Sequence, residues 1–184
     1  MANAIGMLEL SSIAIGFLVE DAMLKASEVR LLLARTICSG KYCVIIGGEV
    51  SAVKNSVDAG MREAREAYID HIVIPNVHES LFAALANTVT LQPEEKGALG
   101  IVETFTVAAI LEAADAAADA ADVRVFRIHV AMAIGGKGFL MLSGDVASVN
   151  AAVKAAAEIA KERGVLVAEV VIPAPSPELF DEYV

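Results

Sequence analysis

The stretch AIGMLE at residues 4–9 returns near the middle of the chain as ALGIVE at residues 98–103. The echo continues through both halves, and it pairs GEV at 48–50 with GDV at 144–146, and IP at 74–75 with IP at 172–173. A tandem duplication of a unit of roughly 90 residues has the usual size of a small domain. We therefore predict two related domains, residues 1–90 and residues 97–184.

Each half has the pattern of strand, helix, strand, strand, helix, strand. In the first half, apolar runs predict strands at residues 4–11, 29–37, 42–46 and 70–75, and three- and four-residue apolar spacing predicts helices between them. The pattern at residues 79–86 predicts a short further helix. Gly47-Gly48 is expected to break the strand predicted at residues 42–46. This order is that of a ferredoxin-like β-α-β-β-α-β unit with an antiparallel sheet. The predicted fold class is α+β, duplicated in tandem.

The second half follows the same order with a different composition. Its first helix is predicted over residues 113–121, which are almost entirely alanine and aspartate. Alanine favours the helix and lets neighbouring backbones approach closely. The polar segment 90–97 ends in glycine and contains Pro93, so it is expected to be the linker between the two domains.

Composition narrows the possible partners. The chain is 57% hydrophobic with a mean hydropathy of +0.61, and small domains cannot hide so much apolar surface alone, so we expect interfaces between subunits and domains. A net charge of −10 leaves no basic stripe for nucleic acid. Charged residues interrupt the apolar stretches before they could cross a bilayer, and no signal-like segment is recognised. A cytoplasmic location without membrane or nucleic-acid partners is expected.

The chain shows no pattern typical of a catalytic or metal site. The three histidines lack ligand spacing, and no nucleophile elbow or phosphate-binding loop is present. The glycine-rich residues 135–138 lie between two predicted strands, which favours a hairpin. Glu9 and Glu103 occupy matching places in apolar strands, and we interpret them as structural hydrogen-bond acceptors. An enzyme is therefore disfavoured.

Only two cysteines are present, too few for a disulfide framework. Cys38 lies in the predicted loop between two strands, where a thiol is chemically available. Taken alone, it is best interpreted as an incidental thiol. Cys43 lies within a Val- and Ile-rich strand and is predicted to be a small buried hydrophobic residue.

The repeated opening, together with DAMLK at 21–25, GEVSAV at 48–53 and the two Ile-Pro strand ends, resembles the bacterial microcompartment shell domain. The resemblance covers essentially the whole chain. Within that family the chain is similar to tandem-domain shell proteins that form trimers. TICSGK at 36–41 and IGGK at 134–137 are most similar to the propanediol-utilisation type.

The resemblance implies a homotrimeric, pseudo-hexagonal tile whose strand-to-strand loops line a central pore. The expected pore-lining residues are Ile37, Cys38, Ser39, Gly40, Ile134, Gly135 and Gly136. It further implies an iron–sulfur cluster of the 4Fe-4S type, one per trimer, held by one Cys38 from each subunit. A three-fold axis can bring together three thiolates, one from each subunit, whereas a single thiolate cannot hold a cluster. The implied roles are electron transfer across the shell or redox sensing, with other shell proteins and encapsulated redox enzymes as partners.

The edges of the expected tile depart from the family pattern. Lys25 stands where shell tiles carry a lysine for edge-to-edge packing, but Asp119 occupies the matching place in the second half. Asn76 and Ala174 replace the basic residue usual after the Ile-Pro strand ends. The sequence therefore favours the trimer more strongly than tight packing of tiles into a sheet.

Two other functions stay open on the sequence alone. The first is a selective metabolite pore in the shell that holds no cluster. The second is a duplicated ferredoxin-like regulatory module that binds a small ligand between its domains.

Overall fold

The computed structural model describes residues 3–38, 40–130 and 134–181, in two compact units that divide after Val77. The first unit contains β1 (Ala4–Leu10), α1 (Ile13–Ala26), β2 (Arg30–Ile37), β3 (Lys41–Gly48), α2 (Val50–Ala64), the 3-10 turn η1 (Arg65–Ala67) and β4 (Tyr68–Pro75). The second contains α3 (Ser80–Leu85), the 3-10 turn η2 (Pro93–Glu95), β5 (Ala98–Thr104), α4 (Val107–Ala120), β6 (Arg124–Val130), β7 (Gly138–Gly144), α5 (Val146–Glu162), β8 (Leu166–Ile172) and α6 (Glu178–Asp181).

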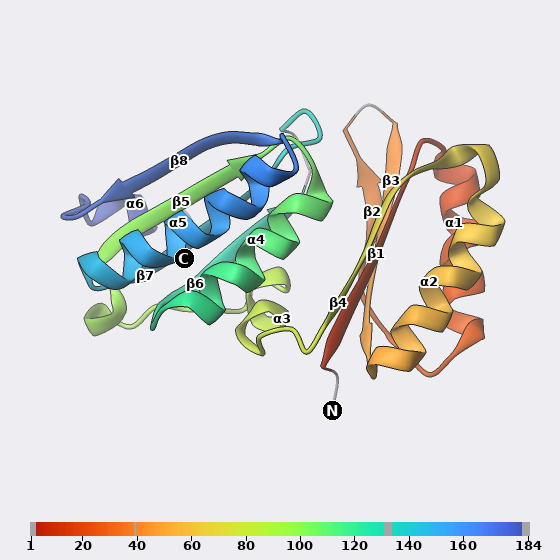
Figure 1. The fold of residues 1–184 in the computed structure, drawn as a ribbon, viewed down its shortest axis with the longest axis horizontal. Coiled ribbons are helices and arrows are strands. Elements are labelled where there is room, and N and C mark those ends of the chain that lie inside the picture. The colour runs from red at the N-terminus through yellow and green to blue at the C-terminus, as the bar shows by residue number, and fades with distance from the viewer. Residues whose placement is uncertain (1–2, 39, 131–133, 182–184) are drawn as a thin grey trace. The chain divides into compact units, whose positions relative to one another are not determined.

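Each unit is a four-stranded antiparallel sheet with its two long helices on one face (Figure 1). The strand order is β2-β3-β1-β4 in the first sheet and β6-β7-β5-β8 in the second, with all pairs antiparallel. This order is that of the split βαβ unit. The predicted duplicated ferredoxin-like α+β fold is therefore confirmed.

The predicted break at Gly47-Gly48 is wrong. Both glycines belong to β3, where Gly47 pairs with Ile5 and Gly48 with Ala4 of β1. The sheet ladder holds them in extended conformation despite their weak strand propensity. Helix α2 begins only at Val50.

Helix α1 packs closely on its sheet because Gly16 leaves room for the ring of Tyr42 on β3. A methyl group on Gly16 would overlap that ring. The Tyr42 hydroxyl donates a hydrogen bond to Glu20 Oε2 at 2.8 Å, which ties the ring back to α1. Burial, and secondarily the bond to Glu20, raises the pKa of Tyr42 to about 12.

At the matching helix and strand positions of the second unit, the large and the small residue are exchanged. Ile110 of α4 matches Gly16, and Gly138 of β7 matches Tyr42. A methyl group on Gly138 would lie 2.5 Å from Cγ2 of Ile110, so the bulk comes from the helix here and from the strand in the first unit. Interiors at crystal-like density tolerate such exchanges only in matched pairs.

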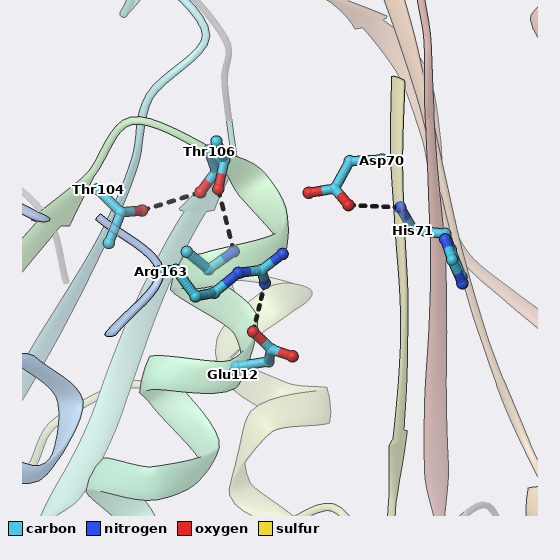
Figure 2. A network of polar contacts seen from close by, with 7 residues as sticks. Asp70, His71, Thr104, Thr106, Glu112 and Arg163 are labelled. Carbon is cyan, nitrogen blue, oxygen red and sulfur yellow. Dashed lines mark hydrogen bonds and ion pairs between the residues drawn. The ribbon is translucent and has the colours of Figure 1, made fainter. Parts of the chain in front are cut away.

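Helix α4 begins at Val107, six residues before its predicted start. Thr106 caps it: Thr106 Oγ1 accepts a hydrogen bond from the Ala109 N–H at 3.3 Å (Figure 2). Thr104 Oγ1 donates to the Thr106 carbonyl at 2.9 Å. The first five residues of α4, 107–111, are all apolar and buried, so they lack the one-sided pattern that marks a surface helix.

Short helices complete the second unit. Helix α3, although it lies in the first predicted domain, packs against β6 and falls in the second compact unit. Phe180 of α6 lies against Phe126 of β6 with ring centroids 6.2 Å apart, in a cluster that includes Leu91, Leu99 and Met141. Among the described residues, no helix combines the length and apolar character needed to cross a membrane.

Candidate functional site

The loop between β2 and β3 carries the candidate thiol. Ile37 ends β2 and is only 5% exposed, Cys38 is partly buried in the turn, and Gly40 is exposed. Gly40 has φ +73°, and no atom lies near the position of a side chain there. Ser39, also predicted to line a pore, lies outside the described residues.

The loop between β6 and β7 is a glycine turn. Gly135 and Gly136 have φ values of +69° and +86°, and this conformation is accessible to glycine at little cost. The Lys137 N–H donates to the Ile134 carbonyl at 3.4 Å, which closes the turn before β7. The predicted hairpin connection is confirmed over the described part, which omits residues 131–133.

A glutamate in the sheet anchors each loop through the lysine at the loop's end. Lys41 Nζ donates to Glu9 Oε1 at 2.8 Å, and Lys137 Nζ donates to Glu103 Oε1 at 2.9 Å. The Glu9 side chain is 4% exposed and that of Glu103 is 32% exposed. The predicted role of the two glutamates as structural acceptors is confirmed, and their partners are the loop lysines.

Strand register places Glu9 in a polar row that the sequence did not reveal. Glu9 pairs with Cys43 on one side and with Asp70 on the other, and Cys43 in turn pairs with Arg35. Directly paired residues on one sheet face lie within side-chain reach of one another. Alternation within each strand was visible, but the pairing between strands depends on a register that sequence alone does not fix.

Cys43 is inaccessible at this place in the row. It is fully buried, and burial, with the nearby charge of Glu9 as the second cause, raises the pKa of its thiol far above the ordinary value. The thiolate is the form that reacts and binds metals, so Cys43 is inert in the folded chain. The predicted buried hydrophobic role is confirmed, and Cys38 is the accessible thiol.

The histidines have structural partners: Tyr68 Oη at 2.7 Å for His71, Ser80 Oγ at 2.8 Å for His78, and the Phe139 ring at 5.0 Å for His129. The His71 backbone N–H also donates to Asp70 Oδ1 at 2.8 Å (Figure 2). Within the described residues, no three His, Cys, Asp or Glu side chains converge in a way that could hold a metal ion. A metal at Cys38 would need ligands from other copies of the chain.

Lys25 lies in the last turn of α1, where its side chain is 74% exposed and pairs with Asp21 at 2.7 Å. An exposed pair of this kind adds little stability, so the lysine can exchange partners easily. Asp119 is exposed at the matching place on α4. Asn76, at the predicted tile edge, has φ +52°, and Ala174 is exposed.

A cleft of about 900 Å³ lies in the second unit, away from the β6–β7 loop. Its wall includes Glu79, Glu94 and Asp122, and Arg124 Nε lies 3.6 Å from Glu95 Oε1. Arg124 begins β6, whereas the loop follows the other end of that strand. The cleft is therefore separate from the glycine turn.

Comparison with known proteins agrees with this geometry. The family model described as "BMC domain" matches residues 4–77 and 98–175. The shell protein PduT of Citrobacter freundii is 43% identical over 184 residues, covering 100% of this chain and 99% of that one. The carboxysome assembly protein CcmO of Synechococcus elongatus is 32% identical over 88% of this chain and 61% of its own length. A crystal structure of a microcompartment protein from Desulfitobacterium hafniense superposes with a TM-score of 0.92 at 46% identity, covering 96% and 97% of the two chains.

The chain therefore belongs to the bacterial microcompartment shell proteins, a structural family. Within it, the chain has two BMC domains in tandem and is similar over its full length to PduT.

Proposed function

We propose that this chain forms a homotrimeric tile of a microcompartment shell in the bacterial cytoplasm, with residues 1–90 and 97–184 as its two shell domains. In this proposal the β2–β3 and β6–β7 loops line the central pore. Three copies of Cys38 bind one iron–sulfur cluster there, of the 4Fe-4S type. The cluster would supply one-electron transfer across the shell or redox sensing.

The observation that carries the proposal is the contrast between the two thiols. Cys43 is buried with a raised thiol pKa, while Cys38 lies partly exposed in a turn. One accessible thiol per chain fits a site built on a symmetry axis, because cluster ligation takes several thiolates. The β6–β7 loop is two residues longer and has no cysteine, which avoids crowding six thiols at one axis.

The residues around Cys38 also fit a ligand loop. Lys41 follows the turn and is held by Glu9, so the end of the loop is fixed to the sheet. Gly40, two residues after Cys38, is exposed, and no atom lies within 4 Å of the position that a side chain would occupy there. A fixed loop holds its ligand in a defined place, which metal sites require of their surroundings.

The test is anaerobic purification followed by iron and sulfide analysis. Wild-type protein is expected to be brown, with broad absorbance at about 400 nm, typical of thiolate-bound clusters, and close to one cluster per trimer. Cys38→Ser should remove colour and iron without changing the oligomeric mass. Cys43→Ser, the matched control, should keep both.

Two results would contradict the cluster. One is a Cys38→Ser protein that remains brown. The other is a colourless wild-type trimer that resists reconstitution with iron and sulfide, and this would leave the cluster-free metabolite pore as the function. Family membership favours either pore over a ligand-binding regulatory module.

The proposed partners are other shell tiles and encapsulated redox enzymes. Exposed Lys25 is the candidate for edge packing with neighbouring tiles. Lys25→Ala should weaken the sheets formed on overexpression and leave the trimer intact, as electron microscopy and gel filtration can show.

A further inference from the structure

Each of the two strands joined by the Cys38 loop carries a cation near its loop end. Arg35 lies on β2 three residues before Cys38, and Lys41 lies on β3 three residues after it. Ile37 and Lys41 are directly paired, so only residues 38–40 form the turn between the strands. Both cations therefore lie at the base of the loop that carries the thiol.

Two carboxylates lie on the other two strands of the same sheet. Glu9 of β1 accepts a hydrogen bond from Lys41 Nζ at 2.8 Å, and Asp70 of β4 is paired with Glu9. On its other side Glu9 is paired with Cys43, which is paired in turn with Arg35. Directly paired residues lie on the same face of a sheet. Charge is therefore ordered across this face, with cations on β2 and β3 and carboxylates on β1 and β4.

The second sheet repeats only the bonded pair. Lys137 Nζ donates to Glu103 Oε1 at 2.9 Å, as at the first loop. In the matching row, strand pairing places His129 on β6 and Ala168 on β8, so a histidine and an alanine replace the arginine and the aspartate. The second loop is anchored without these outer charges. Anchoring therefore does not account for the outer charges of the half that contains the thiol loop.

We propose that Arg35 and Lys41 set the electrostatic potential at the Cys38 loop, and through it the reduction potential of the iron–sulfur cluster, with Glu9 limiting the effect of Lys41. The inference rests on the proposed function for the identity of the bound group. Reduction of a cluster adds one electron and breaks no bond, so the reduced state carries more negative charge. Nearby cations favour that state and raise the potential.

Metal-free protein, prepared with a chelator, tests the electrostatic effect. Cys38 is allowed to react with two small disulfide reagents, one anionic and one cationic. Both attack requires the thiolate, so the ratio of the two rate constants cancels the thiolate fraction and reports the charge around it. Lys41→Met and Arg35→Met should each lower the anionic-to-cationic ratio by about fivefold or more. Glu9→Gln should raise the ratio, because it releases the Lys41 charge from its partner.

Two variants serve as controls. Lys41→Arg keeps the charge, and Lys25→Met removes a cation in the last turn of α1, which the length of β2 separates from the loop. Both should leave the ratio within about twofold of wild type. Raising the salt concentration should shrink the differences between the Met variants and wild type, since screening weakens charge effects and does not reverse a change of loop shape. Circular dichroism checks folding, and Arg35→Met carries the test if Lys41→Met unfolds.

Cluster-loaded protein tests the effect on reduction. A potentiometric titration with mediator dyes supplies the electron and measures the midpoint potential. Lys41→Met and Arg35→Met should each lower the equilibrium constant for reduction by about 10-fold, which corresponds to about 59 mV for one electron. Glu9→Gln should shift the potential in the opposite direction, and Lys25→Met should leave it unchanged.

Unchanged rate ratios in the Met variants, or differences that do not shrink with salt, would overturn the electrostatic role of these residues. Changed ratios with an unchanged midpoint potential would overturn their role toward the cluster. A wild type that takes up no iron and sulfide would remove the proposed cluster and with it the effect on reduction. The rate ratios of metal-free protein would still decide whether the two cations set the potential at the loop.

Discussion

Lys41 Nζ donates a hydrogen bond to Glu9 Oε1 at 2.8 Å across the base of the loop that carries Cys38. Lys137 and Glu103 repeat the pair in the second unit at 2.9 Å. The two pairs differ in burial, since the Glu9 side chain is 4% exposed and that of Glu103 is 32% exposed. The partly exposed Lys137–Glu103 pair can therefore serve as the control for the effect of burial on the Lys41–Glu9 pair.

Lys41→Met should lower the free energy of unfolding by about 2 kcal/mol, because it leaves the Glu9 carboxylate buried without its cation. Methionine keeps the apolar stem and removes only the charge. Lys137→Met should cost less than about 1 kcal/mol, since water reaches Glu103. Urea unfolding measures both, and equal losses would show that burial does not decide the strength of these pairs.

Gly16→Ala should destabilise the first unit by about 1–3 kcal/mol, because the added methyl group overlaps the Tyr42 ring. Glycine to alanine inside a helix ordinarily stabilises it by about 1 kcal/mol, so the sign of the change is diagnostic. Thermal unfolding measures it. Gly16→Ile with Tyr42→Gly, which copies the second unit, should recover part of the loss; no recovery would mean that the exchange of sizes is coincidental.

The two thiols should react very differently with a disulfide reagent once any bound metal has been removed by a chelator. Cys38, partly exposed, should react in the native protein. Cys43 should react only in denaturant, because it is buried and its thiol pKa is raised. Mass spectrometry identifies the modified residue, and native labelling of Cys43 would contradict the burial argument.

Asp115→Asn should raise stability at neutral pH. Burial raises the pKa of Asp115, more than the hydrogen bond from the His78 N–H lowers it, and Asp119 adds to the increase. Its protonated form thus contributes stability below the unfolded value of about 3.9, and this is lost as pH rises through the folded pKa.

Asparagine keeps the acceptor for His78 without the charge. Melting curves from pH 3 to pH 7 should therefore show the variant losing less stability than wild type as the pH rises. Parallel curves would mean that Asp115 is no more difficult to ionise in the folded state than in the unfolded state.

Much of the fold could be predicted because the chain repeats itself. Because the apolar pattern occurs twice, each strand and helix can be predicted from two segments of the chain. Either half alone predicts the ferredoxin-like order. The prediction was wrong where local pattern and tertiary context disagree. Gly47 and Gly48 are weak strand formers held in β3 by pairing with β1, and the first five residues of α4, 107–111, are all buried.

The candidate site was predicted in part. A cysteine in a strand-to-strand loop and a glutamate in an apolar strand are visible in the sequence, and both interpretations concern single residues. The bond from Lys41 to Glu9 joins residues 32 apart. The row of Arg35, Cys43, Glu9 and Asp70 needs the register of four strands, which single-strand alternation does not specify.

The exchange of bulk between Gly16–Tyr42 and Ile110–Gly138 constrains how the gene can change. Recombination between the repeats that copied only the α4 coding segment into the first half would set isoleucine against tyrosine. Copying only the α1 segment into the second half would leave glycine facing glycine around a void. The two halves can be made alike again at this place only by exchanging helix and strand together.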